Sequence, residues 1–351
     1  MVMTNTTKMW QEILEQPSVL ERCKSSSEAV ILNIVEHLKK QHIESVVIAA
    51  RGTSDHAGVY AKYIIEYALE IPVALAAPSI FTTYGKHLNM KNSLVIGISQ
   101  SGKAADVLEV IKSANSCGAT TVSITNDTQS PLATESRFHL FCNAGLEKSV
   151  AATKTFTSQL YLIALLVAAW SGNEAMEKEL SLIPQNITKV IETSSEHIKN
   201  KAERYLYMNE CFILTRGMNY SIALEAALKI QETSYVRAKA YSVSDFHHGP
   251  FAMIEKDMPV FVYAPQGPAL KDIIEMINKL KECQAEIIVI SNNKEVLEMG
   301  NCSFEIPQTD NDMISPFYNV VIAQMFACNL SLIKGLNPDS PRGLNKVTIT
   351  K

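Results

Sequence analysis

The chain has 351 residues, of which 47% are hydrophobic and 19% charged, with a formal net charge of −4. This length suits about two domains of roughly 150 residues with well-filled cores, and the acidic balance argues against a nucleic-acid partner, which would require a basic face. The seven cysteines are scattered without a Cys-x-x-Cys pair, which excludes a disulfide framework and favours reduced thiols in a cytosol.

No membrane partner or leader is expected from the sequence. The longest apolar run, residues 160–170, has 11 residues, whereas a membrane span needs about 20. The run therefore predicts a buried core helix, and the polar residues 1–7 do not resemble a signal peptide. Together with the cysteines, this favours a cytoplasmic protein.

An internal repeat organises the chain. Apolar runs that end in a glycine turn recur at an offset of 165 residues, first as Gly52 and Gly217 and then as Gly102 and Gly267. Each half is predicted to run strand, helix, strand, helix, strand. The expected strands span 45–50, 93–98 and 122–126, and then 211–214, 259–263 and 289–292. Strands that are apolar throughout and alternate with helices predict a parallel sheet covered on both faces.

The predicted fold class is therefore α/β, with two tandem doubly wound α/β/α domains. An amphipathic segment broken at Pro17 precedes the first domain, and a polar helix is expected over 172–201. The predicted segments are an N-terminal helical segment at 1–30, a first domain at 31–190, a second domain at 191–335 and a C-terminal tail at 336–351. In such folds, ligands bind beyond the carboxyl ends of the strands.

Hydroxyl-rich loops follow two strands of the first half. Gly52-Thr53-Ser54 follows one, and Ser99-Gln100-Ser101-Gly102 follows the next. Small residues at a helix N-terminus expose backbone N–H groups and the positive dipole end, so both loops suit a phosphate, although such loops also occur as ordinary turns. The matching loops of the second half lack this pattern, and 264–268 has two prolines without N–H groups. One phosphate site is therefore expected, in the first half.

A charged helical face appears only in the second half. Glu225, Lys229 and Glu232 are spaced four and three residues apart, so they share one face of a helix. On an isolated helix this spacing is typical of a solvated salt-bridge face. The other residues of 221–228 are small or apolar, which favours a cleft.

Two further features have both a structural and a functional interpretation. His247-His248-Gly249-Pro250 lies in a loop near Asp245 and is either a capped turn or a proton shuttle, because imidazole titrates near neutral pH. Too few ligands surround it for zinc, so no metal is expected. Lys346 is by composition a tail lysine, although Pro341-Arg342-Gly343-Leu344 predicts a fixed turn before it.

These motifs resemble the double sugar-isomerase (SIS) domain family, including the isomerase half of glucosamine–fructose-6-phosphate aminotransferase and SIS-type glucosamine-6-phosphate deaminases. The resemblance covers nearly the whole chain. It rests on Glu12-Ile13-Leu14-Glu15-Gln16-Pro17, Arg51-Gly52-Thr53-Ser54, Ser99-Gln100-Ser101-Gly102, Val150-Ala151-Ala152-Thr153-Lys154-Thr155-Phe156-Thr157, Ala223-Leu224-Glu225-Ala226-Ala227-Leu228-Lys229, His248-Gly249-Pro250 and Pro341-Arg342-Gly343-Leu344-Asn345-Lys346. It implies a flavodoxin-like SIS fold, a homodimer, and a metal-independent enzyme that needs no cofactor.

The resemblance also implies roles for the matching residues. The residues implied to hold the phosphate and the sugar hydroxyls are Gly52, Thr53, Ser54, Ser99, Gln100 and Ser101. Val150 would contribute backbone contacts near the sugar.

The remaining implied roles concern catalysis. Glu232 would move a proton between C1 and C2, supported by Lys229 and Glu225. His248 would assist ring opening and, in this family, reaches across a dimer interface. Lys346 would contact the opened sugar as a Schiff-base amine.

The chain also departs from the family pattern. Lys103-Ala104 replaces the usual Glu-Thr after the phosphate loop, so that a hydroxyl is lost and a positive charge gained. His247 stands where lysine is common, and Asn345 stands where alanine is usual. Position 2 holds no cysteine, the nucleophile of the aminotransferase, so glutamine-dependent synthesis by this chain alone is not expected.

The expected activity is that of a phosphosugar isomerase on amino-sugar phosphates, with glucosamine-6-phosphate deaminase as the leading version. The expected partner is a small-molecule sugar phosphate. One alternative is a fructosamine-6-phosphate deglycase. The other is a non-catalytic sugar-phosphate sensor, but sensors of this kind have one SIS domain joined to a helix-turn-helix, and the presence of Glu232 and Lys346 favours an enzyme.

Overall fold

The computed structural model describes residues 7–309 and 311–346, which divide into two compact units. The first-repeat unit contains Glu15–Glu147, Lys154–Pro184 and residues 345–346. The second-repeat unit contains residues 7–14, Lys148–Thr153 and Gln185–Leu344. Each unit is thus assembled from separate stretches of chain, whereas the limits expected from the sequence are contiguous.

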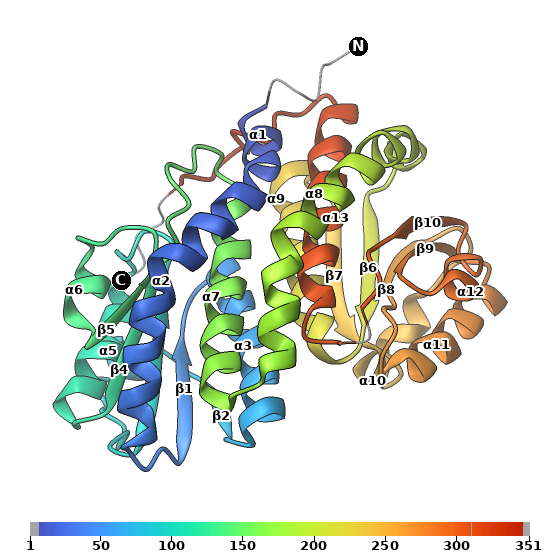
Figure 1. Cartoon of the computed structure of the whole chain (residues 1–351). Coiled ribbons are helices and arrows are strands. Elements are labelled where there is room, and N and C mark those ends of the chain that lie inside the picture. The colour runs from blue at the N-terminus through green and yellow to red at the C-terminus, as the bar shows by residue number, and fades with distance from the viewer. Residues whose placement is uncertain (1–6, 310, 347–351) are drawn as a thin grey trace. The chain divides into compact units, whose positions relative to one another are not determined.

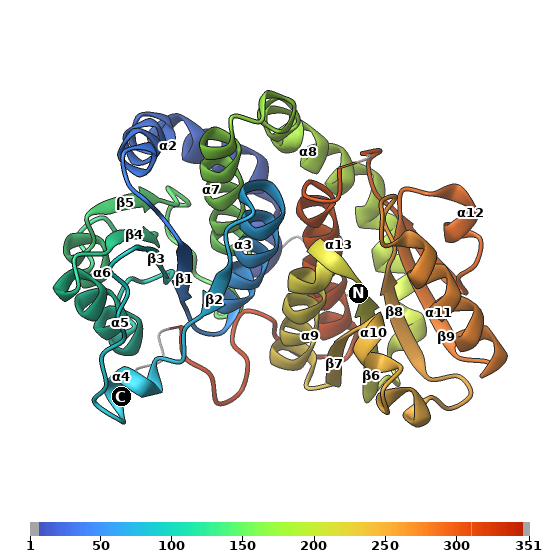
Figure 2. The same ribbon diagram turned by 90° about the horizontal axis from the view of Figure 1, so that it is seen from below.

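Five parallel strands form the sheet of the first-repeat unit (Figure 1). They are β1 (Ser45–Ala49), β2 (Val73–Leu75), β3 (Ser93–Ile98), β4 (Thr120–Thr125) and β5 (Phe138–Phe141). Their spatial order β2-β1-β3-β4-β5 is the flavodoxin-like one. The helices are α2 (Gln16–Lys39), α3 (Thr53–Leu69), α4 (Ser79–Thr82), α5 (Ala105–Ser116), α6 (Pro131–Glu135) and α7 (Lys154–Ser171). Figure 2 shows α2, α3 and α7 on one face and α5 and α6 on the other.

The second-repeat unit has the same plan. Its strands are β6 (Glu210–Thr215), β7 (Arg237–Ser242), β8 (Pro259–Tyr263), β9 (Glu286–Ser291) and β10 (Cys302–Glu305). The order β10-β9-β8-β6-β7 is that of the first sheet read from the other edge. Its helices are α1 (Lys8–Leu14), α9 (Tyr220–Ser234), α10 (Val243–Phe246), α11 (Leu270–Glu282), α12 (Lys294–Leu297) and α13 (Ser315–Ile333), and α8 (Glu174–Ala202) begins in the first-repeat unit. The prediction of two tandem doubly wound α/β/α domains is confirmed.

The prediction of three strands per half is wrong, because each sheet has five. The strands missed are β2, β5, β7 and β10, which are the edge strands of the two sheets. Edge strands have a neighbour on only one side, so they are less buried and need no continuous apolar sequence. Strand β7 illustrates this, since only one of its six residues is buried.

The N-terminal helical segment is two helices, α1 and α2. The predicted break at Pro17 is misplaced, since Glu15 separates the helices and Pro17 lies in the first turn of α2. Proline suits this position because the first N–H groups of a helix have no acceptor within it.

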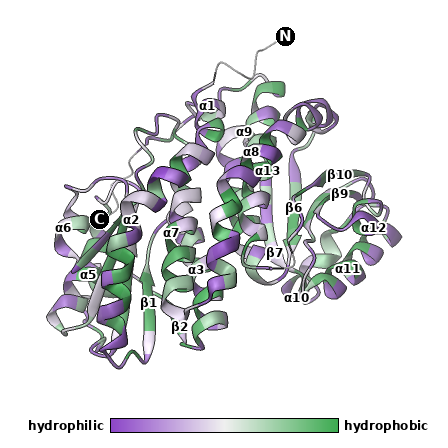
Figure 3. Ribbon diagram, viewed as in Figure 1, coloured by the Kyte–Doolittle hydropathy of each residue, from purple (hydrophilic) through white to green (hydrophobic). Residues whose placement is uncertain are grey.

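Apolar helices form the core of each unit, and hydrophobic residues concentrate on the strands (Figure 3). The run 160–170 belongs to α7 and is largely buried, as predicted. In the described part of the chain, α13 is the one helix long and apolar enough to cross a membrane, but 89% of its apolar window is buried. Such burial is typical of a core helix.

The glycine turns predicted from the repeat have a steric basis. Gly102 has a φ of +63°, and a Cβ there would lie 2.0 Å from Ser130 Oγ. Ser130 cannot readily move, because its hydroxyl donates to the Asp127 carbonyl at 2.7 Å while it also caps α6. Gly102 therefore meets both a conformational and a steric requirement.

We expect Gly102→Ala to lower the free energy of unfolding by about 2–4 kcal/mol, the sum of the left-handed strain and the clash. Gly118→Ala is the matched control, because Gly118 has a φ of +76° with open space around its Cβ position. The control should lose only about 1–2 kcal/mol. Urea unfolding of both variants measures the difference, and equal losses would contradict the clash.

The repeat mate of Gly102 packs against a carboxylate. A Cβ at Gly267 would lie 2.2 Å from Asp312 Oδ1. Burial raises the pKa of Asp312 from 3.8 to about 6. The folded state therefore binds this proton more tightly than the unfolded chain, and the ionised carboxylate costs stability above pH 6.

We expect Asp312→Asn to raise the free energy of unfolding at pH 7.5 by about 1–3 kcal/mol, since the amide has no charge to desolvate. The gain should shrink as the pH falls from 6 towards 3.8, because wild-type Asp312 becomes protonated. Thermal or urea unfolding across this range measures it. A gain that does not change with pH would contradict the assignment.

Candidate active site

The two predicted phosphate loops follow neighbouring strands. Because β1 and β3 pair in parallel, they end at the same edge of the sheet. Gly52 caps the N-terminus of α3, and the 99–102 loop precedes α5. The chain leaves β1 and β3 towards opposite faces (Figure 2), so the loops flank the point where an open α/β sheet binds ligands.

The hydroxyls of these loops are oriented by donors around them. The Oγ atoms of Ser99 and Ser101 accept backbone N–H groups of their own loop at 3.2 and 3.3 Å. Ser54 Oγ accepts from Gln159 Nε2 at 3.1 Å. A hydroxyl that accepts one hydrogen bond keeps its own proton for another acceptor, which suits a phosphate oxygen.

The N-cap residues of the helices beside these loops make no side-chain hydrogen bond, although in α5 the Val107 N–H donates to Asp106 Oδ1 at 2.9 Å. These N-cap residues are Gly52 before α3 and Ala104 before α5. The first N–H groups of a helix have no acceptor within it, and the helix dipole makes this end positive. Both features favour an anion at this edge.

Two residues that the sequence analysis missed hold this region together. Asp106 is buried in the first turn of α5 and accepts from Arg51 Nε at 2.6 Å. The repeat contains a signal for this pair, because Arg216 forms the equivalent ion pair with Asp272, also at 2.6 Å. The second residue, Gln159, is buried on α7 beside Ser54.

The departure at Lys103 changes the charge of this edge. Lys103 is exposed directly after Gly102. The Arg51 side chain is 48% exposed while paired to Asp106. The lost hydroxyl is thus replaced by an exposed positive charge near the end of β3.

The charged face of α9 is buried and not solvated. Lys229 is fully buried, and its Nζ lies 3.4 Å from Glu225 Oε1 and 2.5 Å from Glu232 Oε2. Glu225 is also fully buried, whereas the Glu232 side chain is 21% exposed. A buried ammonium needs such compensation. The cluster therefore presents one carboxylate, Glu232, towards solvent.

Val150 lies in a short loop that is fixed from two sides. The buried carboxylate of Glu12 accepts the backbone N–H groups of Lys148 and Ser149. The N–H of Val150 donates to the Asp339 carbonyl at 3.3 Å. The loop conformation is thus set by α1 and by the tail.

The other polar residues of the N-terminal motif act in the same way inside the first-repeat unit. Glu15 pairs with the buried Lys154 at 2.6 Å. Gln16 accepts from the Thr157 hydroxyl. The motifs 12–17 and 150–157 are far apart in the sequence, but their residues contact one another within each unit.

Lys346 is held by a buried acid that the sequence analysis missed. Its Nζ lies 2.7 Å from Glu147 Oε2, and the Glu147 side chain is fully buried. Glu147 also accepts from the backbone N and the hydroxyl of Thr155 at 3.1 and 2.8 Å, beside the positive end of α7. The tail lysine thus has a specific ionic partner.

His248 lies in an exposed turn after α10. Its N–H donates to the Asp245 carbonyl at 3.0 Å, and Asp245 belongs to α10 and not to a loop. His247 is likewise exposed. Its pKa is lowered by the loss of some hydration and by the nearby positive charges of Lys279 and His248.

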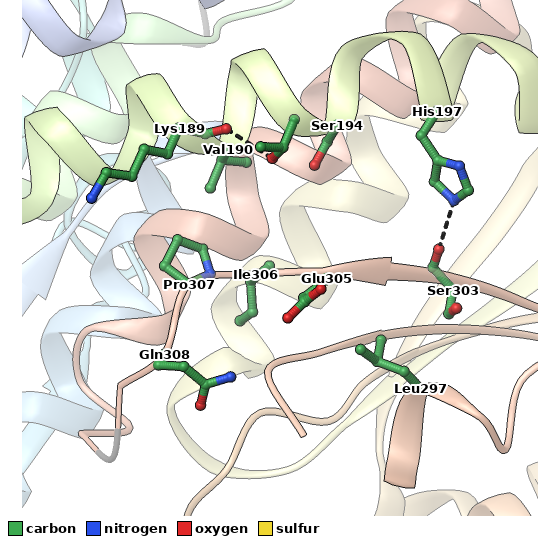
Figure 4. A pocket seen from close by; sticks show the side chains of 11 residues that line it. Lys189, Val190, Ser194, His197, Leu297, Ser303, Glu305, Ile306, Pro307 and Gln308 are labelled. Atoms are coloured by element: carbon green, nitrogen blue, oxygen red, sulfur yellow. Dashed lines mark hydrogen bonds between the residues drawn. The ribbon is translucent and has the colours of Figure 1, made fainter. Parts of the chain in front are cut away.

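A cavity of about 590 Å³ in the second-repeat unit contains none of the predicted site residues. It lies between α8 and the segment from β10 to Gln308 (Figure 4). On its wall, His197 Nε2 lies 3.0 Å from the Ser303 carbonyl. Among residues 7–309 and 311–346, no group of three or more His, Cys, Asp or Glu side chains could hold a metal ion.

Comparison with known proteins gives concordant matches. The chain is 36% identical over 349 residues to a glutamine–fructose-6-phosphate aminotransferase of Aquifex aeolicus, a match that covers 97% of this chain and 57% of the relative. It thus spans little more than half the length of that protein. The C-terminal domain of glucosamine–fructose-6-phosphate aminotransferase from Francisella tularensis superimposes with a TM-score of 0.85 at 28% identity, over 96% of this chain and 98% of that one.

A more distant structure shares the fold. The glucosamine-6-phosphate deaminase of Thermotoga maritima has a TM-score of 0.74 at 22% identity, over 98% of this chain and 100% of that one. The profile of the SIS domain matches two segments, residues 37–169 and 208–334. These segments coincide with the two repeats, so the chain belongs to the SIS domain family.

Proposed function

We propose that this chain is a phosphosugar isomerase that acts on amino-sugar phosphates and converts glucosamine 6-phosphate and water into fructose 6-phosphate and ammonia. The observation that carries the proposal is the buried cluster on α9, in which Lys229 holds Glu232 at 2.5 Å while Glu232 remains partly exposed. The similarity to aminotransferases that handle fructose 6-phosphate supports the choice of substrate.

In this proposal the first-repeat unit binds the phosphate. The hydroxyls of Ser54, Ser99 and Ser101 donate to phosphate oxygens, because each already accepts a hydrogen bond from the protein. Thr53, Gln100 and the first backbone N–H groups of α3 complete the anion site. Binding here fixes the far end of the sugar and leaves C1 and C2 for the chemistry.

Glu232 then acts as the base. After ring opening, assisted by His248, it takes the proton from C2 and returns it to C1. An N–H proton of the amine passes to the aldehyde oxygen, so C1 becomes an alcohol and the C2 amine becomes an imine. Lys229 orients the carboxylate through the 2.5 Å contact, and the buried Glu225 lies 3.4 Å from the same ammonium. Water hydrolyses the imine and releases ammonia.

Lys346 contacts the opened sugar as a Schiff-base amine, which condenses with the C1 aldehyde with loss of water and is released by hydrolysis before Glu232 acts. The ion pair with Glu147 holds the Lys346 side chain in a defined place. When Lys346 leaves this pair, its amine becomes available to the substrate. The exposure of the His248 turn is consistent with a homodimer in which His248 serves the partner subunit. Such a metabolic enzyme would reside in the cytoplasm.

A second candidate is a deglycase that converts a fructosamine 6-phosphate into glucose 6-phosphate and an amine. The proton transfer between C1 and C2 would be the same, in the opposite direction.

The purified chain should release ammonium and fructose 6-phosphate in equal amounts from glucosamine 6-phosphate without glutamine. An enzymatic ammonium assay coupled to a fructose 6-phosphate assay measures both. Release of glucose 6-phosphate from fructosamine 6-phosphates instead would favour the deglycase. Binding of sugar phosphates without any turnover would identify a sensor and contradict the proposal.

We expect Glu232→Gln to lower kcat by about 10²–10⁴-fold, because the amide cannot accept the C2 proton. The affinity for the substrate should change little, since the phosphate site lies elsewhere. Glu275→Gln, at an exposed position on α11, is the matched control and should keep full activity. Steady-state kinetics with an independent binding titration separates the two effects, and an active Glu232→Gln enzyme would refute the role of base.

A further inference from the structure

Tyr235 ends helix α9 in a conformation that does not suit a tyrosine. Its φ and ψ are 56° and 22°, which is the left-handed region, and its N–H donates to the Gln231 carbonyl. Helices that end this way usually have glycine or asparagine here, because a Cβ is strained in this region. The helix end therefore does not explain why the residue is a tyrosine.

The side chain of Tyr235 has a different task. Its phenolic oxygen accepts the backbone N–H of Arg342 at 2.8 Å. The Arg342 guanidinium carbon lies 4.1 Å from the centre of the same ring, well inside the range of a cation–π contact. One residue thus binds both the backbone and the side chain of Arg342.

Arg342 belongs to a stiff part of the tail. Pro338 and Pro341 restrict the backbone before it. Upstream, the Asp339 carboxylate accepts the N–H groups of Lys8 and Met9, both at 2.8 Å. The tail is therefore attached to its own unit first through Asp339 and then through Arg342, and Arg342 is the last of these attachments before Lys346.

We propose that Tyr235 is a positioning residue that fastens the tail through Arg342 and thereby fixes where the chain leads on to Lys346. The inference rests on the proposed function for the role of Lys346, whereas the fastening itself rests on the two contacts. Tyr235 follows Glu232 by three residues, and Lys346 follows Arg342 by four. By fastening Arg342, Tyr235 thus also limits where the amine of Lys346 can reach.

The test compares three variants at these contacts. Tyr235→Phe keeps the ring and loses the acceptor for the Arg342 N–H. Tyr235→Gly removes both contacts but gives the helix its preferred terminal residue. Arg342→Ala keeps the backbone hydrogen bond and loses the cation. Gln284→Gly is the matched control, because Gln284 also has a φ of 56° and lies just after α11 in the same unit.

Three measurements follow each variant: thermal stability, hydrogen exchange at the Arg342 amide, and kcat with KM for glucosamine 6-phosphate. Tyr235→Gly should keep its melting temperature, because the strain is relieved. Hydrogen exchange at its Arg342 amide should nevertheless be faster than in the wild type. Its kcat should fall about 10–100-fold with little change in KM, since misplacing a reacting group costs turnover. Tyr235→Phe and Arg342→Ala should each lose less.

If hydrogen exchange at the Arg342 amide is unchanged in both Tyr235 variants, Tyr235 does not fasten the tail, whatever their kcat and KM. Faster exchange with a kcat equal to that of Gln284→Gly would overturn the positioning role. If the wild-type chain turns over no sugar phosphate, the proposed function fails on its own, and the exchange comparison still decides whether Tyr235 fastens the tail.

Discussion

The burial of Lys229 is a strong constraint on the second-repeat unit. A buried ammonium costs several kcal/mol unless opposite charges surround it, and here Glu225 and Glu232 provide them from the same helix. The spacing of four and three residues, the small neighbours in α9 and the packing of α9 against α13 all serve this arrangement. Because Glu225 is fully buried and Glu232 is not, the partly exposed carboxylate of Glu232 is the one that the cluster presents to solvent.

The two repeats keep one scaffold and use it differently. Both retain an Arg–Gly turn whose arginine pairs with an aspartate in a later helix, and both have a second glycine turn that contacts a side chain. In the first repeat that neighbour is Ser130, and the loop keeps its hydroxyls and N–H groups. In the second repeat the neighbour is Asp312, and prolines replace the donors. The same geometry therefore leaves a loop with free donors in one unit and a proline-containing turn in the other.

The sequence predicts those parts of the fold whose signal is local. Central strands are apolar on both faces, so β1, β3, β4, β6, β8 and β9 are found, while the partly exposed edge strands are not. The site residues named from motifs lie on the expected elements. Three further residues were missed because their roles depend on contacts with residues far away in the sequence. They are Glu147, which contacts Lys346, Asp106, which contacts Arg51, and Gln159, which contacts Ser54. Residue type alone did not reveal the strain at Tyr235, since a tyrosine in the left-handed region has no sequence signature.

The interleaving of the units has a consequence for where the chain can be divided. The chain passes between units five times, after residues 14, 147, 153, 184 and 344. Two units that followed one another in the chain would need one passage, so each unit here includes short stretches from outside its own repeat. A fragment cut at any single bond between the repeats would carry some residues of the other copy's core and lack some of its own. No single cut therefore separates the two units, although each displays the plan of a complete fold.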